Sequence, residues 1–144
     1  MAEPSVLASF RFRVEIDGIA QAGFSEVHVA EATIEVIEHR EGTDPTHVRK
    51  LPGLAKYGNV TLKWGATASN ELFNWWKAIA DGQLQRRNMV VSLLDEQNRP
   101  VKRWAMRNVW PVRYAVSPLV ALDGRVAVTE TLECAVESMV AEAG

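Results

Sequence analysis

The sequence predicts a mainly β fold, a barrel or sandwich of mostly antiparallel strands with one packed α-helix. Three observations predict this class. Several segments alternate apolar and polar residues, tight-turn signals separate some of them, and one segment carries apolar residues at helical spacing. The 144 residues are 47% hydrophobic and 24% charged, which is typical of a globular protein. A chain of this length is expected to form one domain, spanning residues 1–144.

The first strand is marked by strict alternation. Apolar side chains recur at every second position and charged side chains lie between them, at Phe10, Phe12, Val14 and Ile16 against Arg11, Arg13 and Glu15. Asp17–Gly18 then favours a tight hairpin turn. Residues 1–8 come before this strand and are predicted to form a flexible N-terminal arm.

A second strand region runs from about Phe24 to Arg40 and is followed by a long polar loop. The region is too long for one ordinary strand of about 5–6 residues, so a bulge, a bend or an extension beyond the domain is expected. A break at residues 41–45 opens a loop predicted over residues 41–58, rich in basic side chains. Ordering such a loop costs entropy that its own contacts rarely return, so the loop is expected to be held by a partner.

One helix is predicted after this loop. Ser69 is placed to cap it, and Gly82 is placed to end it. Between them, apolar residues follow the i, i+3, i+4, i+7 spacing of one helix face, at Leu72, Trp75, Trp76 and Ile79.

The rest of the chain returns to strands. These are expected over residues 89–94, 101–110 and 126–139. Asp123–Gly124 favours a second hairpin turn before the last of them.

Composition and motifs argue against enzymatic activity, metal binding and membrane insertion. The net charge is −2, so no bulk field attracts nucleic acid or an anionic membrane, and no apolar stretch approaches the ~20 residues that span a bilayer. The histidines lack metal-ligand spacing, and there is no phosphate-binding loop or nucleophile elbow. The lone Cys134 falls on an apolar strand face, where a thiol is inert. We therefore expect no enzymatic activity, no metal, no cofactor and no stable membrane insertion.

Glu130 is the unusual carboxylate. It shares a strand face with Val128 and Leu132, so it is expected to be partly buried and to have a partner. The sequence predicts a structural ion pair with one of three arginines, Arg103, Arg107 or Arg113.

Five tryptophans with basic neighbours raise an alternative, a monomeric β-barrel that stacks single-stranded nucleic acid. The spacing argues against it. Trp64 and Trp104 lie on apolar strand faces, and Trp75 and Trp76 belong to the helix stripe. Most of these rings are therefore expected in the core or at a subunit interface, and sequence-specific nucleic-acid binding is not expected.

A set of motifs in one order resembles the tail-tube proteins of contractile phages and of extracellular contractile injection systems. The strongest motif is the pair of segments 49–54 and 56–63. The others are residues 12–18 with 22–27, residues 38–42, Trp104, Asn108, residues 110–112 and residues 126–133. His39 departs from the pattern, in which an aromatic residue is commoner. The resemblance covers about residues 8–140 and implies a tail-tube-like fold, shared with the tube protein of type VI secretion.

The resemblance implies a structural subunit that forms hexameric rings. Such rings stack into a hollow tube inside a contractile sheath, with baseplate and tube-capping proteins as further partners and a protein effector or DNA as cargo. Sheath contraction drives the tube through a target envelope. The protein would be made in the cytoplasm and assembled into a phage tail or tail-like particle, released by lysis or anchored in the producing cell. The loop would contact the neighbouring ring through Arg40, Thr43, Asp44, His47, Arg49, Lys50, Leu51, Pro52, Leu54, Lys56 and Tyr57.

A tube also implies a polar lumen. The candidate lumen-facing residues lie on two polar strand faces, Glu31, Thr33 and Glu35 on one and Thr129, Thr131 and Glu133 on the other. Both faces are acidic or neutral, so a lumen that does not hold anionic cargo is expected. The sequence leaves open which face lines the lumen, which kind of contractile particle is served, and whether the chain is the main tube protein or a baseplate-proximal isoform.

Overall fold

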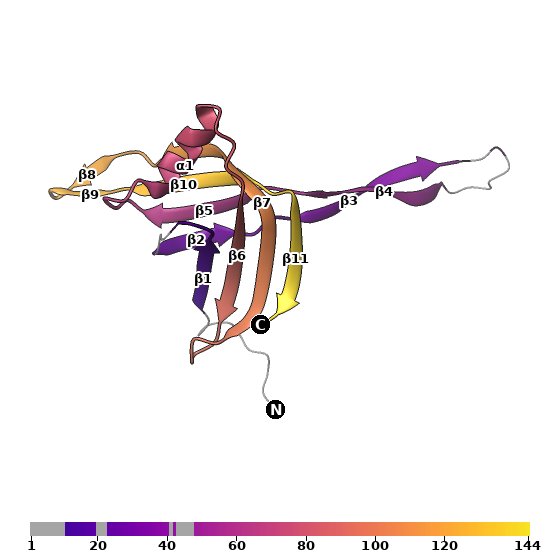
Figure 1. Cartoon of the computed structure of the whole chain (residues 1–144), viewed down its shortest axis with the longest axis horizontal. Helices are drawn as coiled ribbons and strands as arrows, with labels where there is room; N and C mark the ends of the chain where they lie inside the picture. Colours follow the sequence, from indigo (N-terminus) through magenta and orange to yellow (C-terminus); the bar gives the residue numbers. More distant parts are fainter. Residues whose placement is uncertain (1–10, 20–22, 41, 43–47) are drawn as a thin grey trace.

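The computed structural model describes residues 11–19, 23–40, 42 and 48–144 and shows a mainly antiparallel β fold with one helix (Figure 1). This confirms the predicted fold class. The elements are β1 (Arg11–Ile16), β2 (Phe24–His28), β3 (Ala32–His39), β4 (Arg49–Tyr57), β5 (Val60–Gly65), α1 (Glu71–Ala80), β6 (Arg87–Leu94), β7 (Pro100–Val116), β8 (Val120–Leu122), β9 (Arg125–Ala127), β10 (Thr129–Ala135) and β11 (Ser138–Ala143).

Strand β7, with 17 residues, belongs to two layers. Its first half pairs with β6 on one edge and β11 on the other, and β1 pairs with β6. We call the sheet β1-β6-β7-β11 layer 1. The second half of β7 pairs with β10, which continues to β5 and β2, and we call the sheet β7-β10-β5-β2 layer 2. Figure 1 shows the two layers set at a steep angle to each other.

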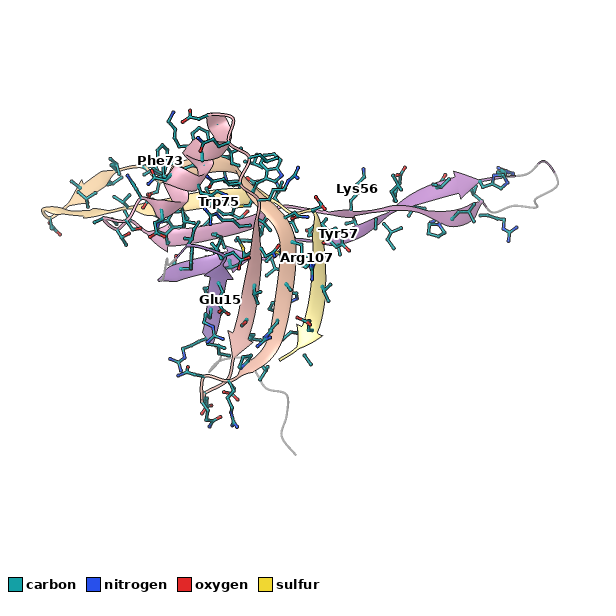
Figure 2. All side chains as sticks on the ribbon, in the orientation of Figure 1. Glu15, Lys56, Tyr57, Phe73, Trp75 and Arg107 are labelled. Carbon is teal, nitrogen blue, oxygen red and sulfur yellow. The ribbon has the colours of Figure 1, made fainter. Side chains whose placement is uncertain are left out.

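The long second strand region extends beyond the layers as a two-stranded hairpin. Strands β2 and β5 pair within layer 2. Among the described strands, their continuations β3 and β4 pair with each other and with no other strand, with a bulge between Ile34 and Val36. We call the β3–β4 hairpin the arm, and it projects from the body on the side of β11 (Figures 1 and 2). The predicted bulge and extension are thus confirmed. The loop predicted over residues 41–58 is corrected, because Arg49–Tyr57 form a strand.

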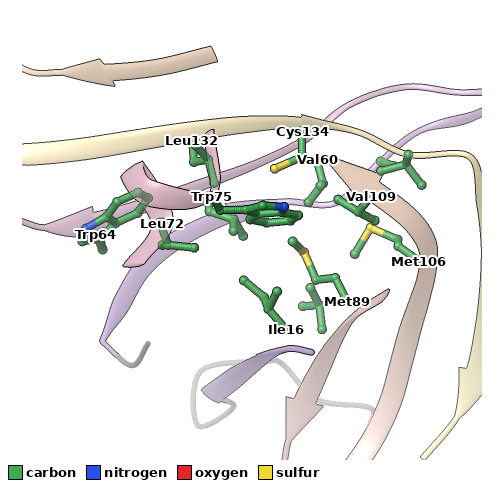
Figure 3. Close-up of a cluster of buried hydrophobic side chains, with 14 residues drawn as sticks. Ile16, Val60, Trp64, Leu72, Trp75, Met89, Met106, Val109, Leu132 and Cys134 are labelled. Carbon is green, nitrogen blue, oxygen red and sulfur yellow. The ribbon is translucent and has the colours of Figure 1, made fainter. Parts of the chain in front are cut away.

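The hydrophobic core lies between the two layers and under α1 (Figure 3). Alternation produces it: along β10, Leu132 and Cys134 are buried while Thr131 and Glu133 between them are half-exposed. The fully buried apolar side chains come from both layers and the helix, and include Val60, Leu62, Leu72, Trp75, Met89, Met106, Val109 and Leu132.

Helix α1 closes the core from one side, with Leu72 and Trp75 buried as predicted. Asn70 occupies the N-cap position, and the Ser69 hydroxyl accepts a hydrogen bond from the Glu71 amide at 3.4 Å. Gly82 follows the helix with φ of +92°, a left-handed conformation that ends helices. Gly82 thus ends the helix as predicted, whereas the N-cap is Asn70 and not the predicted Ser69.

The two predicted tight turns have different outcomes. The Asp17–Gly18 turn forms, with the Ile19 amide donating to the Ile16 carbonyl at 3.0 Å, but β1 pairs with β6 instead of forming a hairpin with β2. Core-side residues of β1 and β6 lie opposite each other, which gives this pairing its register. Asp123–Gly124 does join a hairpin, β8–β9.

Candidate assembly surfaces

The arm exposes apolar side chains on both of its faces. Ile34 and Val36 are about 60% exposed on one face, and Leu54 is 71% exposed on the other. An isolated two-stranded ribbon is marginally stable in water. The arm is therefore a candidate assembly surface on both of its faces.

The predicted loop contacts fall mostly on this arm. Figure 2 shows the Lys56 side chain pointing away from the ribbon. Arg40 directly follows β3, and Thr43, Asp44 and His47 lie outside the described residues. The remaining predicted contacts all belong to β4: Arg49, Lys50, Leu51, Pro52, Leu54, Lys56 and Tyr57.

Within the part of the chain that the structure describes, layer 1 ends in two strand edges with no further partner strand, and the first of these edges is β1. The Asp17 amide donates to the Asn88 carbonyl at 3.1 Å in the register of the β1–β6 pair. Because backbone groups alternate sides along a strand, the odd-numbered residues of β1 bond to β6. The N–H and C=O groups of Phe12 and Val14 therefore point outward from the sheet edge.

Along β11, the strand at the opposite edge, backbone groups also alternate between the two sides of the strand. The Gly144 amide donates to the Val101 carbonyl at 3.2 Å in the register of the β11–β7 pair. Even-numbered residues of β11 therefore bond to β7. The backbone groups of Met139 and Ala141 point outward, away from β7.

The outward-pointing groups of the two edges come from residues on the same face of layer 1. Register places Val14 and Met139 on the side of Met89 and Met106, which is the core side. Two residues that pair across an antiparallel junction share a face. The β1 edge of one molecule and the β11 edge of another therefore match in both hydrogen bonding and sidedness, and the junction would continue the antiparallel alternation.

Layer 2 lacks this symmetry, because α1 covers one of its edges. The Trp76 indole donates to the Val112 carbonyl at 3.2 Å, on the free side of β7. Phe73 packs edge-on against Tyr114 with ring centroids 5.0 Å apart. Among the described strands, layer 2 therefore has one open edge, at β2, whereas layer 1 has two.

The face of layer 1 that points away from the core is rich in arginine, and we call it the arginine face. Register places on it Arg11, Arg13, Arg103 and Arg107, together with Glu15 and Glu142. All six side chains are exposed. This face was not predicted from the sequence, although the alternation of Arg11 and Arg13 with apolar residues marks half of it.

The two polar faces predicted to line a lumen belong to different parts of the molecule. Thr129, Thr131 and Glu133 lie on the outer face of layer 2. By contrast, Glu31 directly precedes the arm, and Thr33 and Glu35 lie within it.

Charges on the outer face of layer 2 are paired. Glu133 accepts hydrogen bonds from Asn59 at 2.7 Å and from Arg113 at 3.0 Å, which lower the pKa of its carboxyl. Lys63 lies 3.5 Å from Glu26, whose pKa is lowered first by its hydrogen bond to His28 and then by Lys63. This face therefore carries little uncompensated charge.

Glu130 is buried, as predicted, but its partners are not arginines. It accepts hydrogen bonds from the Trp64 indole at 3.1 Å and from the Tyr114 hydroxyl. The prediction of an ion pair with Arg103, Arg107 or Arg113 is wrong, because strand alternation separates the groups. Arg113 points to the outer face of layer 2, and the other two lie on the arginine face.

The Glu130–Tyr114 contact predicts a stability loss at high pH. The pKa of Tyr114 is raised from 10 to about 12, first by burial and then by the hydrogen bond to Glu130. The unfolded chain releases this proton near pH 10 and the folded chain releases it near 12, so the stabilisation is complete below pH 10 and is lost as pH rises through 12. Urea unfolding at increasing pH is expected to show this loss in the wild-type chain and a smaller loss in Tyr114→Phe. Equal losses in both would contradict the assignment.

Other candidate chemistry is limited. Cys134 is fully buried, and burial raises the pKa of its thiol well above the ordinary value. Within the described ranges, no cluster of three or more potential ligand side chains has a metal-binding arrangement. Across the same ranges, no helix is long and apolar enough to cross a membrane.

Comparison with known protein families matches residues 8–140 to the T4-like virus tail tube protein gp19 family. This match covers most of the chain, and the protein belongs to that family. The resemblance predicted from the sequence motifs is thereby confirmed. A search of curated proteins gave no match.

Solved structures share the fold. A chain of the anti-feeding prophage (AFP) baseplate, solved with 6-fold symmetrisation, is 25% identical, with a TM-score of 0.82 over 99% of this chain and 98% of that one. A chain of the PVC extracellular contractile injection system sheath-tube complex is 23% identical, with a TM-score of 0.80 over 93% and 89%. Hcp1 from Flavobacterium johnsoniae is 16% identical, with a TM-score of 0.61 over 92% and 95%. The tail-tube-like fold is thus shared with contractile injection systems.

Proposed function

We propose that the protein is the inner-tube subunit of a contractile tail or injection system and forms hexameric rings that stack into a hollow conduit. The observation that carries the proposal is the match between the open β1 and β11 edges of layer 1. Joining β11 of one subunit to β1 of the next gives a continuous antiparallel sheet with every core face on one side. An exposed sheet edge is an aggregation hazard in a monomer, and a closed ring removes it.

The arm supports the same proposal. The arm projects past β11 (Figure 1). In the proposed ring, the β11 edge joins β1 of the next subunit, so the arm first reaches that same subunit. Its exposed apolar residues would be buried there, and its outer end would contribute to contacts with the adjacent ring. In this arrangement the residues predicted for the inter-ring loop serve contacts both within a ring and between rings.

The partners follow from the relatives. The similar chains come from structures described as baseplate, tube-terminating cap and sheath-tube complexes. A sheath, a baseplate and a cap are therefore the proposed partners, and sheath contraction would drive the tube and its cargo through a target envelope. The 25% identity to the anti-feeding prophage chain over nearly the full length favours an injection system over a phage tail. The particle would assemble in the producing cell and be released by lysis or remain anchored there.

The alternative of a monomeric barrel that stacks single-stranded nucleic acid lacks support. All five tryptophans are buried or half-buried, so the described residues offer no exposed indole platform for bases.

The proposal is tested by the mass of the purified protein in solution. Size-exclusion chromatography with light scattering is expected to give six times the 16.0 kDa chain mass, or larger polymers of that unit. A monomer at every concentration, including with a baseplate extract added as template, would overturn it.

A change on the arm is expected to weaken assembly without unfolding the chain. Leu54→Asp places a charge on a side chain that is 71% exposed in the monomer and would be buried between subunits. The free energy of unfolding should stay within about 0.5 kcal/mol of the wild-type value, while the fraction of protein in rings falls. Leu84→Asp is the matched control, since Leu84 is 58% exposed on the segment after α1. Equal losses of rings in both variants would show that the arm has no special part in assembly.

A further inference from the structure

We infer that the arginine face of layer 1 lines the lumen of the tube and makes it selective for acidic polypeptide cargo. This inference rests on the proposed ring. It departs from the lumen faces predicted from the sequence, both of which are acidic or neutral.

The first step is the orientation of layer 1 within a ring. Layer 2 and α1 pack on the core side of layer 1, and no strand or helix of the described residues packs on the opposite face. When copies of layer 1 close into a barrel, the outer side of the wall offers more room for packed elements than the inner side, because circumference increases with radius. Six copies of layer 2, the helix and the arm therefore fit on the outside, which leaves the arginine face inside.

The second step is the charge of this face. Four arginines stand against two glutamates, whereas the whole chain has a net charge of −2. Arg13 lies 3.5 Å from Glu15, and Arg11 donates to Asn98. No ion pair between described residues engages Arg103 or Arg107. These two guanidinium groups, repeated around each ring, are the available cations of the lumen.

A buried hydroxyl lies in the same row of the sheet. Ser92 is directly between Arg13 and Arg103 in the register, is fully buried, and its hydroxyl has no hydrogen-bond partner among the described residues. A carboxylate held between the two arginines would bring an acceptor to this row.

The third step is the class of cargo. Duplex DNA carries one negative charge per ~1.7 Å along its axis, a density that would bring phosphates against Glu15 and Glu142 as well as against the arginines. A polypeptide with spaced carboxylates avoids this repulsion, because its acidic side chains can lie over Arg103 and Arg107. Within a narrow channel such attractions concentrate an acidic chain.

The orientation is tested by labelling cysteines in assembled tubes. Val140 lies on the arginine face and Thr131 on the outer face of layer 2, and the native Cys134 is fully buried. Val140→Cys is expected to react with a small maleimide but not with a maleimide carried by a large globular protein, whereas Thr131→Cys reacts with both. The reverse pattern overturns the inference. If Val140→Cys does not assemble, Ser138→Cys on the same face replaces it.

The selectivity is tested by binding of fluorescent polyglutamate, polylysine and duplex DNA to the same tubes. Polyglutamate is expected to bind most tightly, with weaker binding as salt rises. Arg103→Gln combined with Arg107→Gln should weaken polyglutamate binding about tenfold, and Arg113→Gln, which changes an exposed arginine on the outer face of layer 2, should leave it unchanged. Equal binding by the double variant, or tighter binding of DNA than of polyglutamate, overturns the inference. Electron microscopy of each sample distinguishes failure of the proposed function from failure of the inference. Absence of rings counts against the proposed function, whereas intact rings with the wrong selectivity count against the inference alone.

Discussion

Ala141→Pro is expected to abolish ring formation and to leave a folded monomer. The Ala141 amide points away from β7 by the alternation that the Gly144–Val101 hydrogen bond establishes. Proline removes this donor and places its ring where the next strand would approach. No hydrogen bond between β11 and β7 is lost, so the fold survives and the effect falls on the junction.

The measurement is size-exclusion chromatography beside thermal unfolding. Ala141→Val is the control, because valine keeps the amide and favours a strand. If Ala141→Pro forms rings as abundantly as the wild-type protein, β11 is not a ring edge. A large drop in the unfolding midpoint would show that the Ala141 amide bonds to β7 and does not point outward.

Trp75→Ala is expected to cause the largest loss of stability, about 3–5 kcal/mol. Trp75 lies in the middle of the core (Figure 3), is 2% exposed and donates its indole N–H to the Gln85 carbonyl at 2.7 Å. It joins α1 to residues of both layers, and the Arg87 guanidinium lies 5.6 Å from its ring. Truncation leaves a cavity that this packed core cannot refill.

Urea unfolding of the monomeric Ala141→Pro background would measure this loss without interference from assembly. Trp75→Phe is the control, since it keeps an aromatic ring and loses only the indole hydrogen bond and part of the volume. A loss under about 1 kcal/mol for Trp75→Ala would contradict the central place of this side chain in the core.

Local patterns predicted the elements well where alternation or helical spacing was regular. The first strand, the helix with its end at Gly82, and the turn at Asp123–Gly124 all follow from residues close in sequence. The N-cap lies at Asn70, one residue after the predicted Ser69. Strand partners did not follow. β1 pairs with β6, more than 70 residues away, and no local signal at Asp17–Gly18 distinguishes this from a hairpin with β2.

The arm shows why one strand was predicted as a loop. Pro52 and Gly53 are breakers in ordinary strands, and both lie within β4. A two-stranded ribbon tolerates proline because each strand has a free edge. Gly53 fits because a Cβ there would come within 3.2 Å of the Glu35 Cβ across the bulge. Tertiary context thus overrode a correct reading of local propensity.

The candidate surfaces were predicted in part. The basic β4 residues were singled out from their clustering, although as a loop. The arginine face was missed because its halves are far apart in sequence: Arg11 and Arg13 open the chain's first strand, while Arg103 and Arg107 lie in β7. Only the β1-β6-β7-β11 order brings them onto one face.

A cryo-EM reconstruction of the assembled protein, at a resolution that traces strands, would show directly how the subunits join. We expect a closed wall in which β11 of each subunit runs antiparallel to β1 of its neighbour, with Arg103 and Arg107 inside and α1 outside. A wall joined through the β2 edge of layer 2, or particles without a channel, would contradict it.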